Sequence, residues 1–170
     1  MLTVLIDGPS GSGKSTFAEA LGRHWGLPVV HLDSFYPGWS GLVAAAAMVV
    51  DDVLHPSHPG YRRWDWVDNR PAGWVDLDPG ASVIVEGVGA VTGASISRAE
   101  ERGDVLTVRV CAPAALRRRR ALERDPGFEP WWEMWAAQER EHFAGPGHVP
   151  VHLRIDMSGG NWGYRGLSGT

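Results

Sequence analysis

The sequence predicts an α/β fold, a three-layer sandwich of about five parallel strands with helices on both faces. The first observation is a short apolar run, residues 2–7, followed by a glycine-rich segment and then by residues 14–25, whose apolar side chains recur at helical spacing. The second is that strand-like and helix-like patterns continue to alternate along the chain. The third is that the later strand-like runs are almost continuously apolar, which is typical of parallel strands covered on both faces.

The remaining elements follow from the same patterns and from proline and glycine breakers. Pro113 suits the first turn of a helix, and an alanine-rich helical pattern ends before Pro56. We expect strands at 28–33, 82–86, 105–110 and, at the edge of the sheet, 151–155, and helices at 41–54, 94–102, 113–124 and 129–143. The glycine-rich residues 159–170 are expected to form a flexible tail after one domain of residues 1–158.

Length and composition limit the classes of protein. A chain of 170 residues with 44% hydrophobic content fits one packed domain. The net charge of -4 provides no overall basic field for a polyanion, so we expect no nucleic-acid partner. The longest apolar run, residues 42–50, is well short of the roughly 20 residues that span a bilayer, so we expect no membrane partner. Cys111 is the single cysteine, which suits a reducing, cytoplasmic location.

Residues 8–15, GPSGSGKS, match the phosphate-loop pattern G-x-x-x-x-G-K-[ST] in full, between an expected strand and an expected helix. Glycines let backbone N–H groups converge on phosphate oxygens, and the helix N-terminus adds a positive dipole. Lys14, the only lysine among 16 basic residues, would reach the β- and γ-phosphates, and the Ser15 hydroxyl would ligate Mg²⁺. The alternative is a glycine-rich turn without a ligand. The predicted ATP-binding residues are Gly8, Ser10, Gly11, Ser12, Gly13, Lys14, Ser15 and Thr16.

The rest of the sequence narrows the reaction. A GTPase usually carries an Asn-Lys-x-Asp guanine-reading motif, which a chain with its single lysine in the phosphate loop cannot contain. The helical signature of transporters is missing, and the chain is short for a motor that moves a second domain. Small-molecule kinases remain as the class that the sequence favours.

Four segments resemble the uridine kinase and phosphoribulokinase-like small-molecule kinases, in particular the short uridine-kinase-like proteins. They are the phosphate loop, the DSFY segment 33–36, the VIVEG segment 83–87, and the arginine-rich segment that ends in Arg124 and Asp125. The resemblance covers most of residues 2–156. It implies the P-loop NTPase fold, with ATP bound across the carboxyl ends of the strands.

The resemblance implies that Asp33 is the base for the acceptor hydroxyl and that Tyr36 contacts the acceptor. Asp33 follows an expected strand, and ligands of open α/β sheets gather at the carboxyl ends of strands. A carboxylate there could accept a proton and help to hold a hydrated metal. The alternative is that Asp33 only caps a turn, because aspartate followed by serine is common in turns.

Glu86 ends an apolar strand and precedes Gly87, which would place its carboxylate beside the phosphate loop if the two strands are neighbours. The Glu-Gly form is similar to the kinases named above. We expect Glu86 to act on metal-bound water, with Ser15 and Asp33 as the other metal-binding residues. The alternative is a buried structural carboxylate.

Arg117, Arg120 and Arg124 are spaced three and four residues apart, so a helix would place them on one face. The resemblance implies an arginine-bearing lid over residues 113–125, although Ala121 stands where relatives have an arginine. Such a helix could neutralise transferring phosphates. A solvated basic face is the alternative.

Residues 55–80 lack clear periodicity and are expected to form an ordered loop region, an insertion that binds the acceptor. Asp65 could hydrogen-bond to hydroxyls, Arg62 or Arg63 could hold an anion, and tryptophans could stack on a planar ring. A loop anchored by buried tryptophans is an equal alternative. The seven histidines show no metal-ligand spacing, and we assign them no role.

These observations predict ATP- and Mg²⁺-dependent phosphoryl transfer to a hydroxyl of a small molecule. A uridine- or cytidine-type nucleoside is the first candidate, on the resemblance alone. A nucleotide monophosphate, a sugar or a vitamin-like acceptor is the nearest alternative, and a nucleotide-binding sensor that seldom turns over is another. The sequence gives no indication of the oligomeric state.

Overall fold

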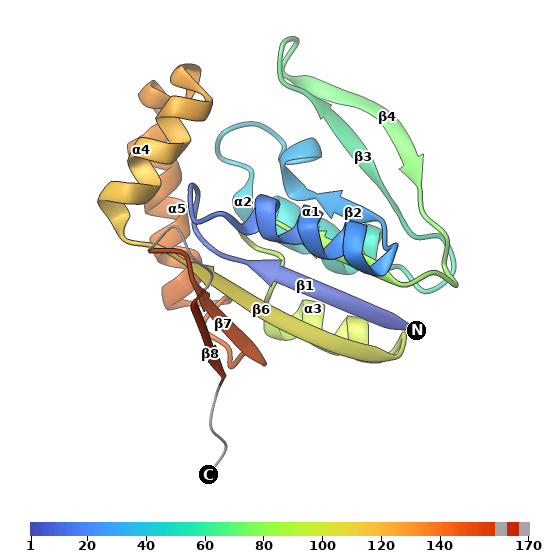
Figure 1. Ribbon diagram of the computed structural model, residues 1–170. Coiled ribbons are helices and arrows are strands. Elements are labelled where there is room, and N and C mark those ends of the chain that lie inside the picture. Colours follow the sequence, from blue (N-terminus) through green and yellow to red (C-terminus); the bar gives the residue numbers. More distant parts are fainter. Residues whose placement is uncertain (159–162, 167–170) are drawn as a thin grey trace.

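A six-stranded sheet forms the centre of the computed structural model, which describes residues 1–158 and 163–166 (Figure 1). The strand order is β2-β5-β1-β6-β7-β8. The first five of these strands are parallel, as predicted, and β8 is antiparallel to β7. The strands are β1 (Leu2–Asp7), β2 (Val29–His31), β5 (Val83–Glu86), β6 (Asp104–Cys111), β7 (Leu153–Asp156) and β8 (Gly163–Gly166).

Helices cover both faces of the sheet, and the alternation along β1 shows how. Val4 and Ile6 face α1 (Lys14–Trp25) and pack with its Ala18, whereas Leu5 faces the opposite layer. Because successive side chains of a strand point to opposite faces, a fully apolar strand must be covered on both. The opposite layer holds α2 (Leu42–Met48), which continues as a π-helical turn over Val49–Val53, with α3 (Gly93–Glu100) and α5 (Trp132–Ala144).

Two turns of 3₁₀-helix shift the expected element boundaries near the site. The expected strand 28–33 ends at His31, and Leu32–Ser34 form a 3₁₀ turn, so Asp33 lies just beyond the strand. The expected helix 129–143 begins only at Trp132, after a 3₁₀ segment Pro126–Trp131 that contains Pro130. A proline lacks the N–H that an α-helix interior requires. The arginine helix α4 (Ala114–Arg124) forms as expected.

The expectation of a loop over residues 55–80 is wrong. Strands β3 (Gly60–Asp65) and β4 (Arg70–Asp76) form an antiparallel hairpin with an irregular register between Arg62 and Trp64. Its turn is closed by the Asp65 carboxylate, which accepts hydrogen bonds from the backbone N–H groups of Val67 and Asp68. Glycine, proline and charged residues on both strands hide the period-two pattern of a half-exposed hairpin.

The carboxyl-terminal edge of the sheet also differs from expectation. The expected edge strand 151–155 is β7, but β8 pairs with it and lies outside it. Residues 163–166 therefore belong to a strand, which corrects this part of the expected flexible tail, and the other tail residues lie outside those described. In Figure 1, α4 and the β3–β4 hairpin extend from the sheet as separate arms. No helix in the described part of the chain is long and apolar enough to cross a membrane.

Candidate active site

The phosphate loop connects β1 to α1 at the carboxyl end of the central strand. Gly11 and Gly13 have φ values of 74° and 96°, in the left-handed region that favours glycine. A Cβ atom on Gly11 would lie 2.1 Å from the Arg117 carbonyl oxygen, so this position also excludes side chains sterically. The sequence pattern thus corresponds to a loop whose shape only glycines permit.

A cavity of about 240 Å³, called the phosphate cavity below, lies next to this loop. Lys14 is buried, and the first residues of α1 line the same space as two arginines of α4. Positive charge and helix N-terminal amides together favour a bound anion. The cavity is lined by Gly11, Gly13, Lys14, Ser15, Thr16, Arg120 and Arg124.

Glu86, at the end of β5, lies beside this cavity and is 1% exposed. Burial opposes its ionisation, but a hydrogen bond with His31 and the nearby charge of Lys14 lower the pKa of its carboxyl below the ordinary value, with a smaller contribution from the Ser15 hydroxyl. One carboxylate oxygen, Oε1, lies 2.5 Å from His31 Nδ1. The other, Oε2, is buried and has no hydrogen-bond partner among the described residues.

These residues fit a magnesium ion. Buried acceptors are normally satisfied, and the unpaired Glu86 Oε2 leaves an acceptor that suits a hydrated cation or its water. The described residues contain no cluster of three His, Cys, Asp or Glu side chains able to hold a metal alone. Mg²⁺ needs no such cluster, because it is usually bound through one or two carboxylates together with substrate phosphates and water.

His31 is a site residue that the sequence analysis missed. Its Nε2 lies 2.8 Å from Glu19 Oε1 on α1, so the ring bridges the Glu19 and Glu86 carboxylates. The hydrogen bond with Glu86 raises the pKa of His31 most, Glu19 adds to it, and partial burial opposes it. The signal in the sequence was positional, because His31 ends the strand that leads to Asp33.

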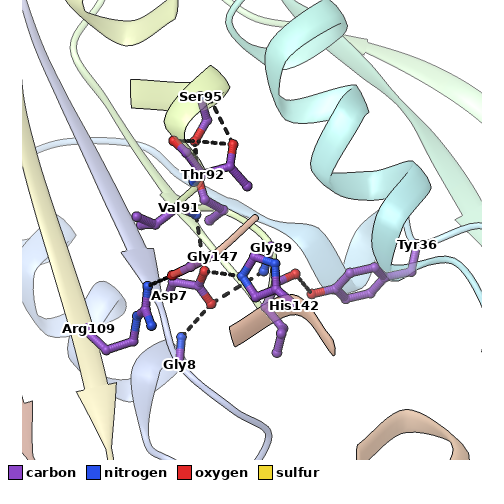
Figure 2. Close-up of polar contacts among 12 residues, drawn as sticks. Asp7, Gly8, Tyr36, Gly89, Val91, Thr92, Ser95, Arg109, His142 and Gly147 are labelled. Atoms are coloured by element: carbon purple, nitrogen blue, oxygen red, sulfur yellow. Dashed lines mark hydrogen bonds and ion pairs between the residues drawn. The ribbon is translucent and has the colours of Figure 1, made fainter. Parts of the chain in front are cut away.

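Asp7 and His142 stabilise the start of the phosphate loop through hydrogen bonds (Figure 2). Asp7 is fully buried, and its carboxylate accepts hydrogen bonds from the backbone N–H groups of Gly8, Gly89 and Val91. His142 Nε2 on α5 lies 2.8 Å from Asp7 Oδ2. This contact joins residues 135 positions apart, and no local pattern indicates it.

Glu139 on α5 holds the middle of the loop. Its Oε1 accepts a hydrogen bond of 2.7 Å from the Ser10 backbone N–H, and its Oε2 lies 3.6 Å from Arg117 Nη1. Arg117 in turn donates to the Ser10 and Ala112 carbonyls. The structure therefore places Ser10 in contact with α5 rather than in the lining of the phosphate cavity.

Arg117, Arg120 and Arg124, the arginines predicted to share one face of α4, do not share one environment. Arg120 and Arg124 line the phosphate cavity, and Arg120 also donates to the Met157 carbonyl. Arg117 lies under the loop, and its side chain does not line that cavity. The helical spacing correctly predicted the shared face of the helix. The phosphate loop packs against this face so that Arg117 contacts the loop backbone, whereas Arg120 and Arg124 line the cavity.

A second cavity, of about 280 Å³, adjoins the site and is walled mainly by aromatic rings. Trp39 is central to this wall, with Phe128 stacked at 5.2 Å between ring centroids and Trp66 tilted at 4.9 Å. Arg124 lines both this cavity and the phosphate cavity. The lining residues are Ser10, Asp33, Tyr36, Trp39, Trp66, Val88, Arg124, Asp125, Phe128 and Trp135.

Asp33 and Tyr36, which the sequence analysis predicts to contact the acceptor, both line this aromatic cavity. The Trp66 indole N–H, from the hairpin turn, donates to the Asp33 carbonyl over 2.9 Å. The Tyr36 hydroxyl donates to the Val88 carbonyl, and burial raises the pKa of Tyr36 well above its ordinary value. The hairpin thus contributes one tryptophan, Trp66, to the wall of the aromatic cavity.

The structure does not bring Arg62, Arg63 or Asp65 to the cavity. Arg62 donates to the Ala72 carbonyl across the hairpin, and Asp65 closes the hairpin turn. Both arginines are exposed. Trp66, one residue after Asp65, is the member of this segment that lines the cavity.

Solved structures of kinases share the fold. A gluconokinase from Sinorhizobium meliloti 1021 matches with a TM-score of 0.53 and 16% identity, over 92% of this chain and 83% of the other. A shikimate kinase from Bacteroides thetaiotaomicron matches with a TM-score of 0.53 and 16% identity, over 91% and 86%. A sugar kinase from Janibacter sp. HTCC2649 matches with a TM-score of 0.53 and 20% identity, over 92% and 85%. At these identities the likeness shows a common α/β three-layer fold. No protein-family model and no curated protein matches the sequence.

The bridge between Glu19, His31 and Glu86 predicts a pH effect. The pKa of His31 in the folded protein lies above its ordinary value of 6.5, so the bridge adds stability that is complete below about pH 6.5 and is lost as pH rises through the folded pKa. Imidazole NMR titration without added divalent cation should give a His31 pKa above 6.5, and Glu19→Gln should lower it. Glu133→Gln, on an exposed face of α5, should leave it unchanged. A wild-type value at or below 6.5 would contradict the bridge.

Proposed function

We propose that the protein transfers a phosphoryl group from ATP to a hydroxyl group of a small molecule. The observation that carries this proposal is the shared wall of the two cavities. Arg124 lines the phosphate cavity together with Lys14, and it lines the aromatic cavity together with Asp33. A group bound over the phosphate loop and a molecule bound among the aromatic rings would therefore meet at one arginine.

The residues of the phosphate cavity suit ATP as the phosphoryl donor. Phosphoryl transfer depends mostly on positioning and on neutralising charge at the phosphate oxygens. Backbone amides of the loop would hold the phosphates, and Lys14, Arg120 and Arg124 would neutralise them. A bound magnesium ion would add further neutralisation, held by Ser15 and Glu86, with Asp33 as the remaining metal-binding candidate.

Asp33 is positioned to act as the general base for the acceptor hydroxyl. It lies in the turn after β2, on the wall of the aromatic cavity, and its backbone is held by Trp66. Its carboxylate would accept the proton of the acceptor hydroxyl as the bond to phosphorus forms. Arg117 has a different role from Arg120 and Arg124 in this proposal, because it donates a hydrogen bond to the loop backbone at Ser10.

The aromatic wall supports an acceptor with a planar ring, since ring faces stack on aromatic side chains. This is consistent with a uridine- or cytidine-type nucleoside, which the sequence resemblance suggests first. Sugar rings can also pack on tryptophan, and the fold is shared with proteins named gluconokinase and sugar kinase. The acceptor is therefore best identified by assay.

A panel of hydroxyl acceptors tests the proposal. ADP formation from Mg-ATP should rise well above the rate of hydrolysis in water when the right nucleoside, nucleotide monophosphate or sugar is added. Stimulation by none of them, together with measurable Mg-ATP affinity, would favour a nucleotide-binding sensor. An absence of magnesium-dependent nucleotide affinity in calorimetry would remove the basis of both functions.

Asp33→Asn should lower the transfer rate by about 10² to 10⁴, because the amide cannot accept the proton in place of the carboxylate. ATP affinity should remain nearly unchanged, because Asp33 does not line the phosphate cavity. Initial rates and ATP titrations of the variant measure the two effects. Asp68→Asn, at the exposed hairpin turn, is the matched control and should behave as wild type. Full turnover by Asp33→Asn would exclude Asp33 as the base.

Trp66→Ala should raise the KM for the acceptor by about 2- to 10-fold, as the loss of one aromatic contact implies. The KM for ATP should not change. Trp66→Phe should give a smaller effect, because it keeps a ring but loses the hydrogen bond to Asp33. Trp25→Ala removes a similarly exposed tryptophan far along α1 and controls for general effects. Equal acceptor KM values in Trp66→Ala and Trp25→Ala would place the acceptor elsewhere.

A further inference from the structure

A third cavity, of about 380 Å³, lies behind the phosphate loop and has a different character from the other two. It is bounded by the ends of β6 and β7, the C-terminal part of α5 and the first residues of the loop. None of its lining residues lines the phosphate cavity or the aromatic cavity. The lining residues are Pro9, Arg109, Cys111, Ala112, Arg117, Phe143, His148 and Arg154.

Three of these residues are arginines, and two of them are paired across the sheet. Arg109 on β6 and Arg154 on β7 are direct partners in the parallel register, and Arg165 on β8 is the next residue in the same row of the backbone. Like charges placed opposite each other on neighbouring strands destabilise a sheet. An anion between them would remove that cost.

The described residues place no carboxylate in direct contact with this pair. Glu139 does not line the cavity and is already bound to Arg117 and to the Ser10 N–H. Asp156 is two residues after Arg154 on β7, does not line the cavity, and accepts a hydrogen bond from the Ser158 backbone N–H. Within residues 1–158, no carboxylate lies within ion-pair distance of Arg109 or Arg154.

Arg109 is held in place and still has donors to offer. One of its Nη2–H groups donates to the Gly147 carbonyl over 2.8 Å (Figure 2), and its guanidinium lies 4.7 Å from the centre of the Phe143 ring. Its Nε–H is buried and has no partner among the described residues. A guanidinium has five N–H donors in a rigid fork that matches phosphate geometry. The arginine is thus fixed by contacts that use only part of its hydrogen-bonding capacity.

We propose that this cavity is a second anion site, which binds a small molecule through a phosphate group. The guanidinium groups of Arg109 and Arg154 can contact one tetrahedral anion, and Arg117, which already pairs with Glu139, lines the same cavity. The cavity volume lies near the lower end of small-molecule sites, roughly 300 to 1,000 Å³. The site adjoins the phosphate loop, because Pro9 lines it and Arg117 also donates to the Ser10 carbonyl. It is separate from the donor and acceptor sites of the proposed function.

NMR titration with inorganic pyrophosphate can observe the two anion sites separately in one sample. Two groups of signals should shift with different midpoints. One group comprises the loop amides at Gly13 and Lys14, and the other comprises the Cys111 amide with the Nε–H groups of Arg109 and Arg154. Arg154→Gln should weaken binding at the second group by about tenfold or more, since a charge-assisted contact to phosphate is lost, and leave the first unchanged.

Arg154 is exposed, so its replacement should leave the fold intact, and Arg140→Gln on α5 is the matched control. Lys14→Gln should weaken the loop response and leave the second group unaffected. The proposal is overturned if the Arg109 and Arg154 signals do not shift, if Arg154→Gln binds as wild type does, or if Lys14→Gln abolishes both responses. If the loop amide signals do not shift but the second group of signals does, the result would count against the proposed function and would still support this second anion site.

Discussion

The buried carboxylate of Asp7 is the constraint on which the site depends. A polar group removed from water must be hydrogen-bonded, and the Asp7 carboxyl meets this need with three backbone N–H groups and His142. These partners belong to the phosphate loop, to the turn after β5 and to α5. One side chain thus fixes the start of the loop relative to the strand that carries Glu86 and to the helix that carries Glu139.

Helix α5 connects the two sides of the site. Its Glu139 holds the Ser10 N–H of the phosphate loop, and its Trp135 lines the aromatic cavity one turn away. A rigid helix that contacts both sides keeps the phosphate loop and the aromatic cavity at a constant separation. Reaction rates of positioned groups depend steeply on such geometry, so a packing helix without a residue in the reaction can still matter for it.

The charged groups beside the loop balance one another over short distances. Glu86 is buried between the cation Lys14 on one side and His31 on the other, and Glu19 extends the series to the surface. A series of alternating charges lets a carboxylate remain ionised where burial alone would protonate it. The arginine pair behind the loop differs, because within residues 1–158 no carboxylate lies within ion-pair distance of Arg109 or Arg154.

The sequence by itself determined the parallel sheet, the phosphate loop and the edge of the sheet where the site lies. These follow from local patterns, namely apolar runs, a glycine-rich motif and helical spacing. Only the tertiary structure decided that Arg117 supports the loop while Arg124 lines two cavities, and that residues 60–76 form a hairpin. It also decided that Trp66 rather than Asp65 lines the aromatic cavity. It also decided that Asp7, His31, Glu139 and His142 belong to the site. The reason is physical: each of these roles depends on a contact between residues far apart in the chain, and spacing within a segment does not record what packs against it.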